Sequence, residues 1–401
     1  MLTERSLEQT AGSSAQADRL ARIIWARVTE PADPLLGAVL DALGAVGALD
    51  WLKSVTHLAP GGADLPAELR NLDRPTRNRV LKSLSRWQPR LADVNPDREM
   101  RALAAFDGSV LTPQDSAWPL ALNDLGHACP ACLWIRGDIN LAAGLERSVA
   151  VVGARASTAY GEEVTAQFVT GLCEREFTIV SGGAYGIDIT AHRAALAVDG
   201  LTVSILAGGA DRLYPRGNAH VLEKVANSGL IVSEHPPGSA PTRARFLTRN
   251  RLIAALARGT VVVEAALRSG ALSTARHAVK LGRPLGAVPG PVTSMMSAGS
   301  HSLIREDGAV CVTDPAEVAE LVGNIGRDLA PEKKAEEQTL FDTLNEDEAA
   351  IVEALPLRKA VSLESVARTA ARSLDKTMAT LAKLEMRDIA CRNGSLWKRN
   401  I

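Results

Sequence analysis

Apolar residues follow two different periods along the chain, which divide it into parts of different structure. Over residues 18–95 they recur at helical spacing, with Pro31, Pro34, Gly44 and Gly47 as interruptions. This part therefore predicts a small helical domain with short turns. From about Met100 the pattern changes to short runs rich in Val and Ile, separated by helical segments. These runs are Val149–Gly153, Thr178–Gly182, Thr202–Gly208, Leu230–Glu234, Thr260–Ala265 and Leu285–Val288.

The runs are nearly continuous in apolar character, which is typical of strands buried on both faces of a parallel sheet. Their spacing leaves room for one crossover helix between each pair. We therefore expect an α/β fold over residues 96–322, a doubly wound Rossmann-type domain with a mostly parallel sheet. In such sheets ligands bind on the loops beyond the carboxyl ends of the strands.

Two polar stretches and a small C-terminal unit complete the predicted organisation. Residues 1–17 are expected to form a disordered tail, and residues 323–345, which are polar and mixed in charge, a linker. In residues 346–401, Ser362 and Ser373 are N-cap candidates for two helices that follow a first one, and Asn393-Gly394 predicts a hairpin turn. Three helices followed by a hairpin are the order of a winged helix, so we expect a winged-helix-like domain.

Composition favours a cytoplasmic protein that does not act at a membrane. The five cysteines are odd in number and unevenly spread, which fits a reducing compartment better than a disulfide framework. We find no run of about 18 apolar residues that would predict a transmembrane helix. The polar N-terminus also lacks the apolar core of a signal peptide.

The net charge of −1 hides an uneven distribution. Between Arg243 and Arg305 there are ten Lys and Arg residues and one acidic residue, Glu264, so this segment carries about +9 and the rest about −10. A neutral protein with one strongly basic segment is typical of a localised anion site. The alternative is a basic face that is simply solvated.

Small residues follow the predicted strands at the positions where an anion would bind. They are Gly153, Gly182, Gly208, Gly209, Ser269 and Gly270. A glycine at a strand end lets backbone N–H groups approach an anion at the start of the next helix. The glycines do not have the G-x-G-x-x-G spacing, so we expect no dinucleotide cofactor. Arg155, in the first of these loops, could bind a phosphate through two guanidinium nitrogens or brace a neighbouring loop.

The densest cluster of functional side chains is RARFLTRNR, residues 243–251. Four arginines around one phenylalanine, in a chain with 3% aromatic residues, suit single-stranded nucleic acid. Arginines would follow the phosphates while the ring stacks on a base. The candidate contacts are Arg243, Phe246, Arg249, Asn250 and Arg251. The alternative is that Phe246 belongs to the core and that half of the arginines are only solvated.

Three other features carry weaker signals. Asp188 could cap a helix, and His192, one turn later, is interpreted as a structural, hydrogen-bonding residue. Cys129 and Cys132 form a C-x-x-C pair, but no second pair lies at zinc-finger spacing. We therefore expect neither a metal site nor redox chemistry there.

Seven motifs in order closely resemble the DNA-processing protein A family (DprA or Smf) over about Trp118 to Ala309. They are VGARASTAYG, SGGAYGIDITAH, AGGADRLYP, SEHPPG, FLTRNRLIA, VVVEAALRSGALSTA and AVPG. The resemblance implies an extended Rossmann domain that binds single-stranded DNA without hydrolysing it. It also implies a homodimer that helps to load the RecA recombinase in natural transformation. By family position Arg155, Arg243 and Phe246 would contact DNA, while Ala154 and Tyr185 depart from the family's usual residues and put the affinity in doubt.

Two other functions stay open. The core also looks like nucleotide phosphoribohydrolases, but cleavage needs a placed carboxylate, and Glu264 is the candidate that the basic segment offers. The other alternative is a double-stranded DNA binder that acts through residues 346–401. The third helix of that domain is expected to be only mildly basic, with Lys376, Lys383 and Arg387.

Overall fold

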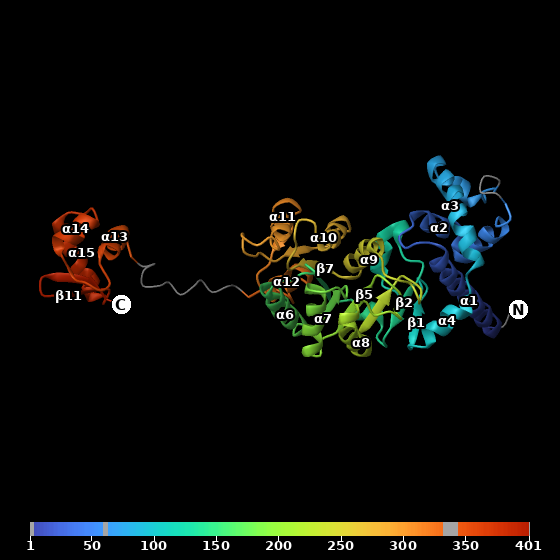
Figure 1. Cartoon of the computed structure of the whole chain (residues 1–401), viewed down its shortest axis with the longest axis horizontal. Coiled ribbons are helices and arrows are strands. Elements are labelled where there is room, and N and C mark those ends of the chain that lie inside the picture. The colour runs from blue at the N-terminus through green and yellow to red at the C-terminus, as the bar shows by residue number, and fades with distance from the viewer. Residues whose placement is uncertain (1–3, 59–62, 332–343, 401) are drawn as a thin grey trace. The chain divides into compact units, whose positions relative to one another are not determined.

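The computed structural model describes residues 4–58, 63–331 and 344–400 of the chain (Figure 1). It divides into two compact units, Met1–Ala330 and Pro331–Ile401. The first unit contains both the N-terminal helices and the α/β core.

The N-terminal part of the first unit is helical, as predicted. Its helices are α1 (Glu4–Val28), α2 (Pro34–Ser54), α3 (Arg74–Ala92) and α4 (Pro96–Ala104), with a short 3-10 helix η1 (Glu68–Asn71). Asp33 and Asp73 cap α2 and α3, each followed by a proline in the first helical turn. The prediction of a disordered tail over residues 1–17 is wrong from Glu4 onward. Helix-favouring Leu, Glu, Gln and Ala residues there extend the amphipathic α1 by several turns.

By length and composition alone α2 could cross a membrane, although Asp41 and Asp50 interrupt its apolar run, so that the sequence predicts no such helix. Half of its most apolar window is buried. Its side chains belong to the same hydrophobic cluster as Trp25 and Trp87, whose rings meet edge to face at 5.5 Å. This packing is that of a core helix.

The core of the first unit is a nine-stranded sheet, and the predicted fold class is confirmed. The six predicted strands are β3 (Ser148–Val152), β4 (Thr178–Ser181), β5 (Thr202–Leu206), β6 (Leu230–Ser233), β7 (Gly259–Val262) and β8 (Leu285–Ala287). Three further strands are β1 (Gly108–Leu111), β2 (Leu133–Arg136) and β9 (Val310–Cys311). The order is β1-β2-β6-β5-β4-β3-β7-β8-β9. Strands β3 to β9 are parallel, and β2 and β1 add an antiparallel edge.

Helices cover both faces of this sheet (Figure 1). In β3, Val149 and Val151 pack on one face against α6 (Ala159–Cys173) and α7 (Ile187–Ala197). Ala150 and Val152 pack on the other face against α9 (Arg243–Leu256) and α10 (Ala271–Lys280). The remaining helices are α5 (Leu141–Gly144), α8 (Ala219–Ser228), α11 (Ala298–Glu306) and α12 (Pro315–Val322), with 3-10 turns η2 (Leu120–Ala128) and η3 (Arg216–Asn218). Burial on both faces explains the continuous apolar runs.

The strand order contains one reversal, beside β3. The chain places β4, β5 and β6 in succession on one side of β3, and then crosses to place β7 and β8 on the other. The loops that follow β3 and β7 therefore diverge to opposite faces and leave a crevice at the carboxyl ends of these two strands. Such a switch point is where doubly wound sheets bind their ligands.

The second unit contains the predicted helices and hairpin. Its elements are α13 (Glu346–Ala354), β10 (Val361–Ser362), α14 (Leu363–Thr369), α15 (Leu374–Met386), β11 (Ala390–Asn393) and β12 (Leu396–Arg399). Ser362 and Ser373 cap α14 and α15, as predicted. Strand β10, which was not predicted, extends the hairpin to three antiparallel strands. The assignment as a winged helix stays a prediction.

The first residues of the predicted linker belong to the first unit. Arg147 donates hydrogen bonds of 3.0 and 2.8 Å to the two carboxylate oxygens of Asp328, whose side chain is 5% exposed. Residues 323–330 are therefore tied to the core, which corrects the predicted start of the linker. Residues 332–343 lie outside the described residues.

This pair predicts a pH-dependent contribution to stability. The hydrogen bonds from Arg147 lower the pKa of Asp328 to about 2. A carboxyl group whose pKa is lower in the folded than in the unfolded protein stabilises the fold at pH values above its unfolded-state pKa of about 4. This stabilisation is lost as the pH falls toward the folded-state pKa. We expect Asp328→Asn to lower the free energy of unfolding at pH 7 by about 1–3 kcal/mol. Urea unfolding of both proteins at pH 7 and at about pH 2 checks this, and a difference of the same size at both pH values would contradict it.

Candidate functional site

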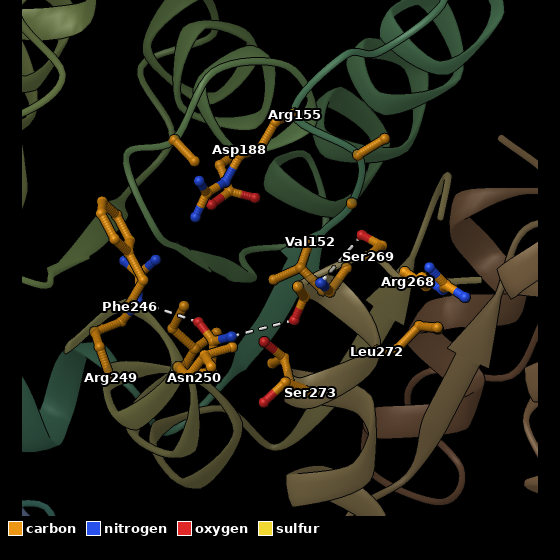
Figure 2. A pocket seen from close by; sticks show the side chains of 18 of the residues that line it. Val152, Arg155, Asp188, Phe246, Arg249, Asn250, Arg268, Ser269, Leu272 and Ser273 are labelled. Carbon is orange, nitrogen blue, oxygen red and sulfur yellow. Dashed lines mark hydrogen bonds between the residues drawn. The ribbon is translucent and has the colours of Figure 1, made fainter. Parts of the chain in front are cut away.

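A cavity of about 1090 Å³ opens at the switch point (Figure 2). Its walls come from residues 152–156 after β3, residues 241–250 at the start of α9, and residues 266–276 between β7 and the first turns of α10. Thr242 starts α9 by accepting a hydrogen bond from the backbone N–H of Arg245. Three segments that are far apart in the sequence thus meet where the sheet topology predicts a ligand.

The lining of this cavity is strongly basic. Among the described residues, five arginines and one acidic residue line it: Arg155, Arg243, Arg249, Arg268, Arg276 and Asp188. All the arginines except Arg249 are exposed, whereas Asp188 is buried. The free charge in the cavity is therefore positive, and guanidinium groups suit phosphate because they bind two oxygens at once.

Phe246 stands in the wall of the cavity between cationic groups. The guanidinium carbon of Arg155 lies 4.7 Å from the centre of its ring, and that of Arg249 lies 5.8 Å away. The Tyr214 ring is 6.1 Å away and tilted by 52°. These contacts keep a half-buried ring beside charges that can hold a phosphate. Figure 2 shows Phe246 of α9 across the cavity from Arg268 and Ser269, while Asn250 of α9 reaches the segment that contains Ser269 through a hydrogen bond.

Arg249 forms the floor of the cavity together with Asp188. Burial lowers the pKa of Arg249 to about 10, so its guanidinium remains charged at neutral pH, and it donates to the carbonyl of Ile205. Burial also raises the pKa of Asp188, against the opposing effect of the nearby Arg249. A Cβ on Gly182 would lie 2.5 Å from an Arg249 nitrogen and 2.6 Å from an Asp188 oxygen. Gly182 is therefore required for this buried pair to fit under the cavity.

The predicted glycines divide into those that line the cavity and those that do not. Gly153 and Gly270 line it, as does Ser269, and the carbonyl of Gly270 accepts a hydrogen bond of 3.1 Å from Asn250 Nδ2. Gly182 and Gly208 border only a small recess that shares Phe246 and Arg249 with the cavity. A Cβ on Gly208 or Gly209 would lie 2.9 Å from a backbone carbonyl of the 236–239 loop. At that strand end the glycines thus allow close backbone packing, and their contact with phosphate stays a prediction.

Arg251 does not line the cavity, so the structure places it apart from the other candidate contacts of α9. Its two terminal nitrogens each donate a 2.7 Å hydrogen bond to a carboxylate oxygen of Glu234, and it also donates to the carbonyl of Ala128. The Arg251 and Glu234 side chains are 5% and 9% exposed. Arg251 therefore holds α9 against β6 and η2. Arg268 and Arg276, which line the cavity instead, were not singled out, although the excess of basic residues over 243–305 includes them.

The other singled-out residues have structural partners. Glu264 is 2% exposed, lies outside the cavity lining, and accepts hydrogen bonds of 2.9 and 2.6 Å from the backbone N–H and the hydroxyl of Thr158. The predicted hydrogen bond of His192 is confirmed, at 2.7 Å to the Thr202 hydroxyl, and burial lowers its pKa to about 3. Burial raises the pKa of Cys129 to about 11 and that of Cys132 to about 12. Both thiols are therefore protonated at neutral pH.

Comparison with known proteins gives consistent matches. The family model described as DNA recombination-mediator protein A matches residues 109–323. A putative DNA processing protein DprA of Mycobacterium tuberculosis is 43% identical over 335 residues, which are 80% of this chain and 85% of that protein. The DNA processing protein DprA of Streptococcus pneumoniae is 38% identical over 226 residues, 56% of this chain and 77% of that one. An X-ray structure of DprA from Streptococcus pneumoniae superposes with a TM-score of 0.56 and 30% identity, covering 69% of this chain and 92% of that one.

Proposed function

Because the chain belongs to the DNA recombination-mediator protein A family, we propose that it is a DNA-binding protein without catalytic activity. Its ligand is single-stranded DNA, which it protects on entry and on which it helps to load the RecA recombinase in natural transformation and recombination. It acts in the cytoplasm as a homodimer. The observation that supports the DNA-binding part is the cavity at the switch point, where exposed arginines surround Phe246.

The chemistry of the cavity favours a single strand over a duplex. A single strand offers unpaired bases that can stack on an aromatic ring while arginines contact the adjacent phosphates. Phe246 and Arg155 are close enough to do both for neighbouring nucleotides. Bases in a duplex are stacked on each other and cannot reach a ring in a wall.

The salt dependence of binding tests this proposal. If about four phosphates are neutralised by the four exposed arginines, log K should fall with log salt with a slope of about −3, since each phosphate on a single strand contributes about 0.7. Fluorescence anisotropy with labelled oligo-dT, over a series of salt concentrations, measures the slope. A duplex of the same length is the control and is expected to bind more weakly. An affinity for oligo-dT that does not change with salt would overturn the proposal.

The RecA part needs its own measurement. We expect the full chain to speed the assembly of RecA filaments on single-stranded DNA that is already covered by a single-strand-binding protein. If the chain binds DNA but does not speed filament assembly, the RecA part of the proposal is wrong and the DNA-binding part is unaffected.

The phosphoribohydrolase alternative is less well supported. Glycosidic cleavage needs a carboxylate that can reach the substrate. Glu264 is buried outside the lining, and Asp188 lines the cavity but is buried on its floor beside Arg249. Release of a free base from nucleoside monophosphates would support this alternative.

The other alternative is a double-stranded DNA binder that acts through residues 346–401. Loss of all DNA binding on deletion of residues 340–401 would favour it.

A further inference from the structure

A second cavity, of about 220 Å³, lies beside the first turn of α9, between the N-terminal helices and the α/β core. Arg243 lines the first cavity and Arg245, two residues later, lines the second. The polar and charged residues that line the second cavity are Arg27, Thr29, Glu30, Arg90, Asp93, His235, Ser239 and Arg245. The two cavities thus share the start of α9.

Glu30 bridges two arginines from different parts of the fold. One carboxylate oxygen lies 3.3 Å from a terminal nitrogen of Arg90, on α3, and the other lies 3.3 Å from one of Arg245, on α9. The side chains of Glu30, Arg90 and Arg245 are 52%, 45% and 24% exposed. Ion pairs with this exposure stabilise a fold only slightly, so the bridge can open at little cost.

Among the charged residues that line the second cavity, Glu30, Arg90 and Arg245 form its ionic centre. Arg27 is engaged by Glu99 at 2.5 Å and donates to the carbonyl of Pro237. His235 is neutral, because burial and the neighbouring Arg245 and Arg251 lower its pKa to about 3. Asp93 adds one negative charge to the lining. Two guanidinium groups that share one carboxylate have the same arrangement that they would have around one phosphate.

We propose that Glu30 occupies the place of a phosphate in the unliganded protein, and that the bound strand displaces it. A strand that fills the first cavity then continues across the first turn of α9, and its next phosphate binds Arg245 and Arg90 in place of Glu30. The N-terminal helices thereby become part of the DNA path. This inference rests on the proposed binding of single-stranded DNA in the first cavity.

The test compares a short and a long strand on variants of the full chain. We use oligo-dT of about 6 and about 15 nucleotides, which span the site sizes of single-strand-binding folds. Glu30→Gln removes the competing carboxylate and should tighten binding of the long strand about two- to tenfold, while leaving the short strand unchanged. Arg90→Ala should weaken only the long strand and reduce its salt slope by about 0.7.

Arg86→Ala is the matched control. Arg86 lies on α3 one turn before Arg90, is 62% exposed and faces an acid, Asp33, at 3.7 Å, but it does not line the second cavity. It should change neither strand. The ratio of the two affinities is the readout, because a partly unfolded variant would lose both equally. If Glu30→Gln and Arg90→Ala leave this ratio at the wild-type value, the inference is overturned, whereas failure of the wild-type protein to bind either strand overturns the proposed function.

Discussion

Replacing Phe246 by alanine is expected to weaken binding of oligo-dT by about 5- to 150-fold, since stacking of one base on an aromatic side chain contributes about 1–3 kcal/mol. The ring is half-buried at the wall of the first cavity, with Arg155 over it at 4.7 Å. Its loss removes the stacking surface and leaves the exposed arginines in place. The salt slope should therefore remain near the wild-type value while the affinity falls. Anisotropy titrations of the variant and the wild type, at several salt concentrations, measure both quantities.

Two controls separate stacking from packing. Phe246→Trp keeps an aromatic surface and should retain most of the affinity, whereas Phe246→Leu keeps apolar volume only and should behave like the alanine variant. An abasic strand of equal length offers no base to stack, so Phe246→Ala should have little effect on its binding. An equal loss with the normal and the abasic strand would mean that Phe246 acts only by shaping the cavity.

Replacing Arg251 by alanine is expected to lower the free energy of unfolding by about 3–5 kcal/mol, because it leaves the buried carboxylate of Glu234 without its partner. The carbonyl of Ala128 loses its donor in the same variant. Urea unfolding followed by circular dichroism measures this loss. Any effect on DNA binding should follow from the fraction of unfolded protein.

Arg243→Ala is the matched comparison on the same helix. Arg243 is exposed and lines the cavity, so its loss should change the free energy of unfolding by less than about 0.5 kcal/mol while it weakens DNA binding. A double variant, Arg251→Met with Glu234→Leu, should recover much of the stability, because it removes both buried charges at once. If the Arg251→Ala protein is stable but no longer binds DNA, Arg251 contacts the DNA and this prediction is wrong.

The central strands could be predicted from the sequence because strands that are buried on both faces form continuous apolar runs. Residues 149–152 and 260–263 are apolar at nearly every position, since alternate side chains pack against helices on opposite faces. The edge strands lack such continuous apolar runs. β9 has two residues, both exposed, and β1 is only partly buried. Their pairing depends on contacts with strands distant in the sequence, which periodicity does not reveal.

The candidate site was predictable in composition but not in the orientation of its side chains. The sequence places four arginines between residues 243 and 251, and nothing in that segment distinguishes the outward Arg243 from the inward Arg251. The distinction comes from Glu234, which follows β6, and from Ala128, the last residue of η2, which the fold brings to α9. Helix α1 illustrates the same limit, because its polar composition resembles that of a free tail.

The strands at the two edges of the sheet are short, which limits their pairing with the edge of another sheet. The outermost strands are the four-residue β1 and the two-residue β9, so each edge exposes few unpaired backbone N–H and C=O groups. Short edge strands are a common protection against edge-to-edge aggregation. If this chain binds single-stranded DNA as proposed, copies bound along one strand are held at high local concentration, where they meet often. These blunt edges allow such crowding without the copies joining into a fibre.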